Sequence, residues 1–214
     1  MRMKSLVSLI VLLAVAGMAN ADLVNFNGKL VDLQSWVGSG SNEAVLVIDW
    51  NDEIAPASLA WGYKWEGTAT GRDMLNAVKA ADNRLFEAIG GWNGTAGTST
   101  VYGFGYDVDG DGGSFVSTAV GIETGYASDA DDHYSEGWSS AGFWGYSSST
   151  NGQDWSYITG LSERVLSDNC WDGWSFGAAD AGWWGGDPTV PTPEPVTAVL
   201  LGLGSLLALK RKNN

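Results

Sequence analysis

Three aspartates at alternate positions form the sharpest chemical motif of the chain. Asp107, Asp109 and Asp111 are followed directly by Gly112 in the stretch DVDGDG. Carboxylate oxygens are ligands that calcium prefers, and a glycine at the sixth position lets a calcium loop turn sharply. The spacing therefore predicts a calcium site at these aspartates. The twelfth position holds Thr118 instead of a glutamate, so the alternative is a polar hairpin turn, in which Asp and Gly are common.

A second acidic stretch, DADDHYSE at residues 129–136, contains His133, the only histidine of the chain. A transition-metal site usually recruits several His or Cys side chains, and this stretch offers one. Runs of charge are usually solvated. The pattern therefore favours an exposed acidic loop over a metal site.

Nucleophilic catalysis finds little support in the sequence, and we assign no catalytic residue. Cys170 is the only cysteine, and nothing brings it near His133. Cys170 lies among aromatic residues in NCWDGW, which is typical of a small buried side chain. A pair of carboxylates for glycoside hydrolysis stays open, because the chain has 25 acidic residues and only their separation in space identifies such a pair.

The chain contains 12 tryptophans. Trp and Tyr rings that stack on sugars, with Asp and Asn acceptors around them, would form a carbohydrate platform. Large aromatic side chains also dominate the energetics of protein cores. We expect Trp61, Trp65 and most of the others to fill the core, and the sequence identifies no ligand platform by residue.

Alternating hydrophobic residues indicate short strands. Leu59, Trp61, Tyr63 and Trp65 alternate with smaller or polar residues, which is the period of a strand with one face in the core. The composition, rich in glycine and aromatic residues, favours short aromatic strands joined by glycine-rich turns.

Further strands complete the expected β structure. Residues 44–50, AVLVIDW, are typical of a strand buried on both faces. Residues 101–108 and 114–120 are expected to form a hairpin across DGDGG. Later strands are expected at residues 142–147, 155–158 and 173–176. Residues 22–187 are thus predicted to form one mainly β domain, similar to an antiparallel β-sandwich.

One amphipathic helix is predicted over residues 70–89. Thr70 and Asp73 have the spacing of a capping box at its start. Gly90 and Gly91 supply a stop. Hydrophobic residues at helical spacing would face the sheet: Met74, Val78, Ala81, Leu85 and Ile89.

The formal net charge of the chain is −14 at pH 7. Nucleic acid and anionic lipid bind positive surfaces, so they are poor partners for the domain. Cations, neutral sugars and basic proteins remain as partner classes.

The first 21 residues have the pattern of a signal peptide. Arg2 and Lys4 precede an apolar stretch at residues 6–16, and Ala19-Asn20-Ala21 is a small-residue cleavage site. We expect secretion across the inner membrane and a mature protein that begins at Asp22.

The end of the chain combines three features in a fixed order. A proline-rich spacer at residues 188–195 ends in Pro193-Glu194-Pro195. An apolar segment at residues 196–209 follows, and its expected helix is about 21 Å long. The chain then closes with a basic cluster, Lys210, Arg211 and Lys212, which would stay on the cytoplasmic side of a membrane.

This package resembles the PEP-CTERM sorting signal of Gram-negative bacteria, over the last two dozen residues only. The resemblance implies that an exosortase-type enzyme of the inner membrane recognises the Pro-Glu-Pro region and processes the tail. The precursor would then be held in the membrane by residues 196–214, and the domain would reach the cell surface or the extracellular matrix. The spacer would lift the domain off the membrane.

The sequence therefore predicts a secreted, non-enzymatic surface or matrix protein that is stabilised by calcium. Its expected partners are an extracellular polysaccharide or a surface protein, in addition to the processing enzyme. The alternative is a secreted carbohydrate-active enzyme that uses a carboxylate pair.

Overall fold

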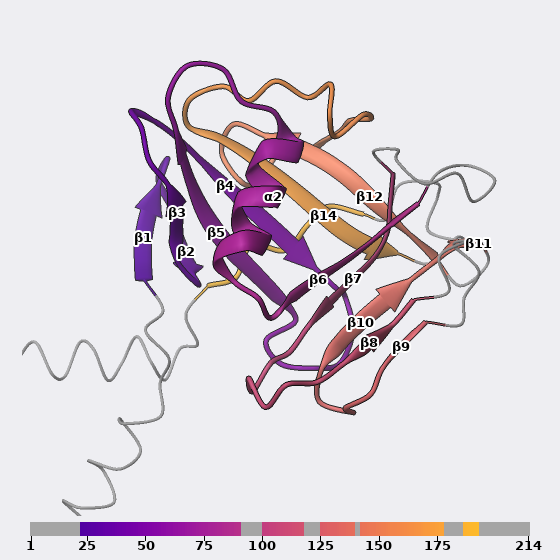
Figure 1. Cartoon of the computed structure of the whole chain (residues 1–214). Coiled ribbons are helices and arrows are strands. Elements are labelled where there is room, and N and C mark those ends of the chain that lie inside the picture. Colours follow the sequence, from indigo (N-terminus) through magenta and orange to yellow (C-terminus); the bar gives the residue numbers. More distant parts are fainter. Residues whose placement is uncertain (1–21, 91–99, 118–124, 140–141, 178–185, 193–214) are drawn as a thin grey trace, which may run out of the picture.

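The computed structural model describes residues 22–90, 100–117, 125–139, 142–177 and 186–192. The described chain is mainly β, with one helix, as the sequence predicts. Seven strands form the main sheet, which crosses the centre of the molecule (Figure 1). In order across the sheet they are β11 (Trp138–Ser139), β12 (Gly142–Ser149), β14 (Cys170–Gly177), β4 (Asn42–Asp49), β5 (Ser58–Trp65) and β3 (Trp36–Gly38), with β13 (Ser156–Tyr157) paired to β12.

The main sheet is mixed, whereas the sequence predicts a purely antiparallel structure. β14 runs parallel to β4, and β3 runs parallel to β5, while the other pairs are antiparallel. Parallel neighbours need a long connection, and residues 50–169 separate β4 from β14. The strands expected at residues 142–147, 155–158 and 173–176 are confirmed as β12, β13 and β14, with shifted ends.

Three smaller sheets surround the main sheet. β10 (His133–Glu136), β7 (Thr100–Tyr106) and β6 (Leu85–Gly90) form a three-stranded antiparallel sheet. β1 (Asp22–Phe26) and β2 (Lys29–Leu33) form a hairpin, and β8 (Phe115–Val116) pairs with β9 (Tyr126–Ala127).

Both faces of the main sheet are covered. Ala44, Leu46 and Ile48 of β4 contact a core that includes residues of α2 (Gly71–Ala81) and of the three-stranded sheet; we call this side the helix face. Val45 and Val47 contact a second core with residues of the β1–β2 hairpin; we call this side the hairpin face. The prediction of a strand buried on both sides is confirmed.

The helix is shorter than the sequence predicts. Its start is confirmed, because Thr70 caps it and exchanges hydrogen bonds with Asp73. It ends at Ala81, and Leu85 already belongs to strand β6. Asp82 ends the helix because its carboxylate accepts hydrogen bonds from Arg84, which turns the chain toward the sheet. Hydrophobic residues at helical spacing therefore continue in the sequence beyond the end of the helix.

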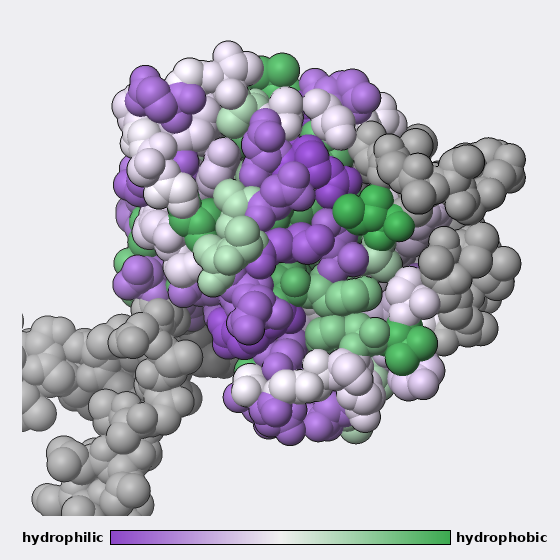
Figure 2. Space-filling view, viewed as in Figure 1, coloured by the Kyte–Doolittle hydropathy of each residue, from purple (hydrophilic) through white to green (hydrophobic). Residues whose placement is uncertain are grey.

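The hairpin expected across DGDGG does not form. Both edges of β7 are occupied, by β6 and by β10, so β8 pairs with β9 instead. The ring of Phe115 packs over Gly105 of β7, where a Cβ atom would lie 2.6 Å from it. On this side of the molecule hydrophobic residues reach the surface (Figure 2), including Ile89, 43% exposed, and Val116, 41% exposed.

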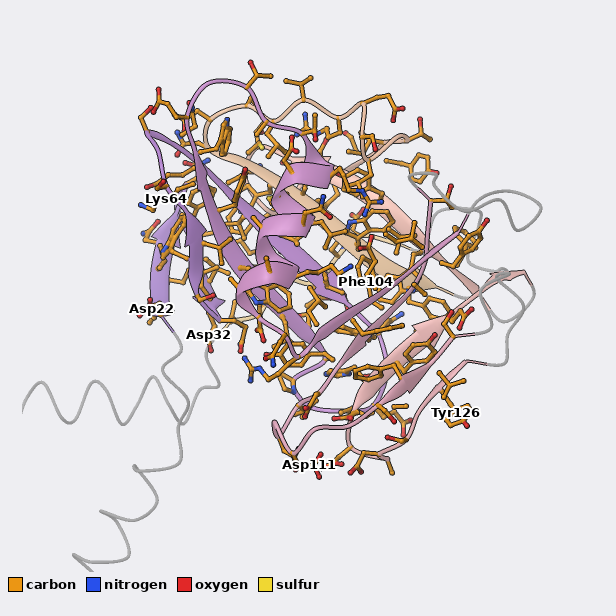
Figure 3. The ribbon with its side chains drawn as sticks, in the orientation of Figure 1. Asp22, Asp32, Lys64, Phe104, Asp111 and Tyr126 are labelled. Carbon is orange, nitrogen blue, oxygen red and sulfur yellow. The ribbon has the colours of Figure 1, made fainter. Side chains whose placement is uncertain are left out.

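Most of the described tryptophans fill the core, as expected. Trp61 and Trp65 are buried on the helix face with Leu59 and Tyr63, so the side chains expected in the core lie there. The expectation that only one face of β5 lies in the core is wrong, because Ala60 on its other face is buried in the core of the hairpin face. Four other tryptophans are also buried: Trp50, Trp144, Trp171 and Trp174. The ring of Trp144 meets those of Trp50 and Phe104, and Trp174 also meets Phe104, which lies in the interior (Figure 3). Trp171 instead contacts Phe26 in the core of the hairpin face.

The start of the proline-rich spacer packs on the domain and does not project from it. Val190 is buried in the core of the hairpin face. The backbone N–H of Asp32 donates to the carbonyl of Pro191 at 3.0 Å, and that of Thr189 donates to Asp49 at 2.8 Å. The expectation that this segment lifts the domain off a membrane is therefore wrong for residues 188–191, because their apolar side chains and backbone groups find partners on the hairpin face.

Candidate functional site

The end of the β7–β10 ladder brings two buried aspartates together. The strands are antiparallel, and Tyr106 pairs with His133. The next positions in this register are Asp107 and Asp132, one residue beyond the paired segment. Both aspartates are buried. Strand pairing thus places two carboxylates at one point of the domain.

Asp109 completes a cluster of three carboxylates, which we call the acidic triad. One oxygen from each of Asp107, Asp109 and Asp132 lies within 4.8 Å of the others. Two ligands on opposite sides of a calcium ion are about 4.6–5.2 Å apart, which is twice the usual calcium–oxygen distance. The three oxygens are therefore close enough to share one such ion.

Backbone amides hold the loop in this shape. The N–H groups of Gly110 and Gly112 donate to the two oxygens of Asp107, at 2.7 and 3.1 Å. Both glycines have positive φ, which side chains rarely adopt. The turn chemistry of DGDG therefore accounts for the shape of the loop without any ion.

The environment of the Asp132 carboxylate points to a bound cation. Its Oδ1 accepts a hydrogen bond from the N–H of Val108 at 3.0 Å, but its buried Oδ2 has no hydrogen-bond partner among the described residues. Burial raises the pKa of Asp132, the bond from Val108 opposes this shift, and the charge of Asp107 adds to it. A buried carboxylate oxygen without a partner is costly. A cation in the triad would remove that cost.

No described lysine or arginine forms an ion pair with the acidic triad. Arg84, whose carbonyl accepts from the N–H of Asp107, directs its guanidinium to Asp82 at 3.0 Å. Within the described part of the chain, the triad therefore has no cationic side chain of its own, although the charge of Arg84 interacts with that of Asp107.

Asp111, which the sequence assigns to the site, lies outside the triad. It is exposed at the outer edge of the molecule (Figure 3), and its N–H donates to Asp109 at 3.0 Å. The charge of Asp109 raises the pKa of Asp111. Asp132 joins the triad in its place. The sequence shows Asp132 in an acidic run, but only the pairing of β7 with β10 places it beside Asp107.

His133 is buried, and its ring nitrogens are not available to bind a metal. Its Nδ1 lies 2.9 Å from Asp52 Oδ2, and its Nε2 lies 2.9 Å from the carbonyl oxygen of Pro56. The ring stacks on Trp50 with centroids 4.5 Å apart. Both ring nitrogens are engaged, so the ligands available at the triad are oxygens, which suit calcium better than zinc.

The expectation of an exposed acidic loop at residues 129–136 is therefore wrong for its second half. Asp132, His133 and Glu136 are buried, while Ala130 and Asp131 are exposed. Residues 133–136 form the edge strand β10, whose side chains turn inward where they meet β7.

The described residues do not assemble a nucleophile. Cys170 is buried as expected, and burial raises the pKa of its thiol to about 11. Residues 173–177, GWSFG, match the G-x-S-x-G spacing of hydrolase nucleophile elbows, a match that the sequence reasoning missed. The structure places this stretch inside β14 and not at a strand-to-helix turn, and Ser175 pairs with Asp49 on the hairpin face, opposite the side on which His133 stacks on Trp50.

The predicted sorting signal, Pro193, Glu194 and Pro195 with Lys210, Arg211 and Lys212, lies outside the described residues, as does the predicted signal peptide. In the part that the structure describes, no helix has the length and apolar character to cross a membrane.

Comparison with known proteins gives no relative from which a function could be transferred. No family model matches the chain, and no curated protein or solved structure shows significant similarity to it.

Proposed function

We propose that this chain is a non-enzymatic protein of the cell surface or extracellular matrix, with a domain stabilised by calcium bound to Asp107, Asp109 and Asp132. The observation that carries the proposal is that Asp132, a member of the acidic triad, has a buried Oδ2 without a hydrogen-bond partner among the described residues. Calcium would take these oxygens together with carbonyl groups or water, since it binds six to eight oxygen ligands.

Calcium binding at this point would join two distant parts of the chain. Asp107 and Asp109 follow β7, whereas Asp132 precedes β10. Without an ion the carboxylates repel one another at the end of the ladder. A bound calcium ion would attract all three carboxylates, so binding would stabilise the three-stranded sheet that covers the helix face.

The proposed location is supported by the two ends of the sequence. A signal peptide at residues 1–21 would direct secretion, and the PEP-CTERM-like tail would attach the precursor to the inner membrane until an exosortase-type enzyme processes it. A polysaccharide or a protein of the cell surface is the partner class that this route makes available.

The non-enzymatic role is supported by two buried carboxylates that bind side chains of neighbouring elements. Glu87 of β6 binds Arg72 at 2.5 Å and Lys79 at 2.6 Å, which fastens α2 to the three-stranded sheet. Asp172 of β14 binds Arg164 at 3.0 Å and accepts from the hydroxyl of Tyr146. These acids hold elements together and do not face one another across a substrate site.

The experiment compares thermal unfolding of the wild type, Asp132→Asn and Asp111→Asn, each in EGTA and in excess calcium. For an affinity typical of extracellular sites, about 10- to 100-fold excess over Kd stabilises by ~1.4–2.7 kcal/mol. The wild-type Tm should therefore rise by about 3–10 °C in calcium. Asp132→Asn should abolish this rise and, in EGTA, melt no lower than the wild type, because it removes an unpaired buried charge.

Asp111→Asn is the matched control, because it removes the same charge from the same loop but outside the triad. It should keep the calcium response. Loss of the response in Asp111→Asn but not in Asp132→Asn would contradict the assignment of ligands. A wild type whose Tm is the same in EGTA and in calcium would refute the calcium site itself.

A further inference from the structure

The outer face of the β1–β2 hairpin carries two leucines that the domain leaves exposed. Val24 and Val31 contact the core of the hairpin face, and successive side chains of a strand point to opposite sides. Leu23 and Leu30 therefore point outward, and they are 44% and 51% exposed. Leu23 pairs with Asp32, two residues beyond Leu30, so the two leucines are diagonal neighbours on this face. We call them the leucine pair.

The docked segment of the spacer ends beside the leucine pair. The N–H of Asp32 donates to the carbonyl of Pro191, so Pro191 lies on the edge of β2 that faces away from β1. Leu23 lies across β2 from it, about two strand spacings or ~10 Å away. Figure 3 labels Asp32 at this end of the hairpin. Thr192, the last described residue, thus follows directly from a point beside the outer face.

The connection from the domain to the apolar segment is short. Only Pro193-Glu194-Pro195 separates Thr192 from Val196, where the apolar segment begins. Four peptide steps span at most ~14 Å. The headgroup layer takes up about 5–7 Å on each side of a bilayer, so Thr192 would be held within roughly 9 Å of the lipid surface. Packed sheet layers are ~10 Å apart, so the domain has no room to stand away from the membrane.

The length of the apolar segment removes the remaining freedom. The expected helix over residues 196–209 is about 21 Å long, whereas the hydrocarbon core is ~30 Å thick. A segment that is too short is accommodated by local thinning of the bilayer or by flanking side chains that reach to the interface. Neither response leaves slack between Val196 and the docked segment.

We propose that, in the membrane-anchored precursor, the outer face of the β1–β2 hairpin lies on the lipid surface, with Leu23 and Leu30 in the interfacial region. The proposal rests on the location proposed above, because it needs the tail to be inserted in the membrane. The partner is a neutral lipid surface, since Asp32 beside the leucine pair and the net charge of −14 disfavour anionic headgroups.

The contact depends on the tether and ends when the tail is removed. A tether this short gives the hairpin an effective concentration at the membrane in the millimolar range, so a weak contact suffices. Two leucine side chains offer less apolar surface than a myristoyl chain, which itself gives only marginal membrane binding. Cleavage of the tail would therefore release the domain from the lipid.

The test uses the full chain with its own signal peptide, secreted by a bacterial host without an exosortase-type enzyme and reconstituted into phosphatidylcholine nanodiscs. Leu30→Cys carries an environment-sensitive fluorophore, and the buried Cys170 with its raised thiol pKa stays unlabelled. With nitroxide on the lipid headgroups, the label at position 30 should lose more than about half of its emission, because interfacial side chains lie about 5–10 Å into the headgroup boundary.

Two variants test the orientation and the tether. Val165→Cys is the matched control: Val165 is 55% exposed but bridges to Thr70, next to α2 on the helix face, so its label should keep its emission. An insertion of about twenty Gly and Ser residues after Thr192 lowers the effective concentration about 10-fold. Quenching at position 30 should then fall, although the tail stays inserted.

Flotation of reconstituted vesicles separates this proposal from the location on which it rests. A full chain that does not float with lipid would overturn the membrane location and the contact together. A chain that floats, but whose labels at positions 30 and 165 are quenched equally or not at all, would overturn the contact alone.

Two further results would contradict the proposal. A blue shift at position 30 without quenching would assign the leucine pair to a protein surface, from the tail or from a second copy of the chain. Quenching that the insertion leaves unchanged would show that the short tether does not impose the contact.

Discussion

At the scale of single residues, buried polar side chains determine how the layers of this domain are joined. Asp82, at the end of α2, accepts hydrogen bonds from the indole of Trp61 and the hydroxyl of Tyr106, both at 3.2 Å. Burial would raise the pKa of Asp82, but hydrogen bonds from Arg84 and Trp61 outweigh it and lower the pKa. Asp82 therefore stabilises the fold above the ordinary pKa of an aspartate, and this contribution is lost as the pH falls through the lowered value.

The thiol of Cys170 gives a prediction at the same scale. Because burial raises its pKa from 9.0 to about 11, the folded protein should contain about 100-fold less thiolate near pH 8 than the unfolded chain. Labelling with a chromogenic disulfide reagent should be slower by at least this factor in buffer than in guanidinium chloride. Complete labelling of the folded protein at the rate of the unfolded chain would show that Cys170 is accessible and activated.

At the scale of elements, the segment at residues 186–192 acts as part of the domain. Pro188 packs against Gly173 of β14, where a Cβ atom would lie 2.6 Å from the proline ring. Val190 fills the core between β2 and the main sheet. The segment thus closes one end of the hairpin face, although its sequence has the proline content of a linker.

This docking predicts that Val190→Ala destabilises the domain. Removing two buried methyl groups should cost ~2 kcal/mol, which corresponds to a decrease in Tm of about 4–8 °C for a domain of this size. Thr189→Ala is the control, because Thr189 is exposed and binds Asp49 through its backbone N–H alone. If the segment were only a tether, both variants would melt like the wild type.

At the scale of the whole molecule, the two ends of the domain meet at the same hairpin. β1 begins at Asp22, which pairs with Leu33 of β2, and the N–H of the neighbouring Asp32 binds the carbonyl of Pro191 (Figure 1). Along the sequence, the proposed signal-peptidase site directly precedes Asp22, and the proposed site for an exosortase-type enzyme follows Thr192. Residues 188–191 pack on the domain, and the Pro-Glu-Pro motif begins two residues later in the sequence, at Pro193.

The processing route predicts the mass of the protein recovered from the native cell surface or medium. An intact mass that begins at Asp22 and ends near Pro195 is the expected result, because both signals would be removed by then. A mass that retains Lys210 to Asn214 would instead show a tail anchor that is not processed. The proposed calcium site is independent of this outcome.

Features that depend on neighbours along the chain could be predicted from the amino-acid sequence alone. Thr70 and Asp73 fix the start of α2 because a capping box needs only residues three apart. The continuous hydrophobic run of β4 and the alternating large residues of β5 are visible because successive side chains of a strand point to opposite faces. The DGDG turn at Asp107 and the burial of Cys170 follow from local composition in the same way.

Features that depend on contacts with distant residues could not be predicted and follow from the folded arrangement. Asp132 replaces Asp111 in the acidic triad because β10 pairs with β7. This pairing brings Asp132 to the N–H of Val108, which lies 24 residues earlier in the sequence. The helix stops at Ala81 because the side chain of Asp82 bonds to Arg84 and to the sheet, although the hydrophobic spacing continues. His133 is buried because Asp52 and Pro56 of another loop meet its ring. For the acidic triad and for His133 the deciding contacts join segments that are distant in the sequence. At the helix end the local bond between Asp82 and Arg84 is joined by hydrogen bonds from Trp61 and Tyr106 of the sheets.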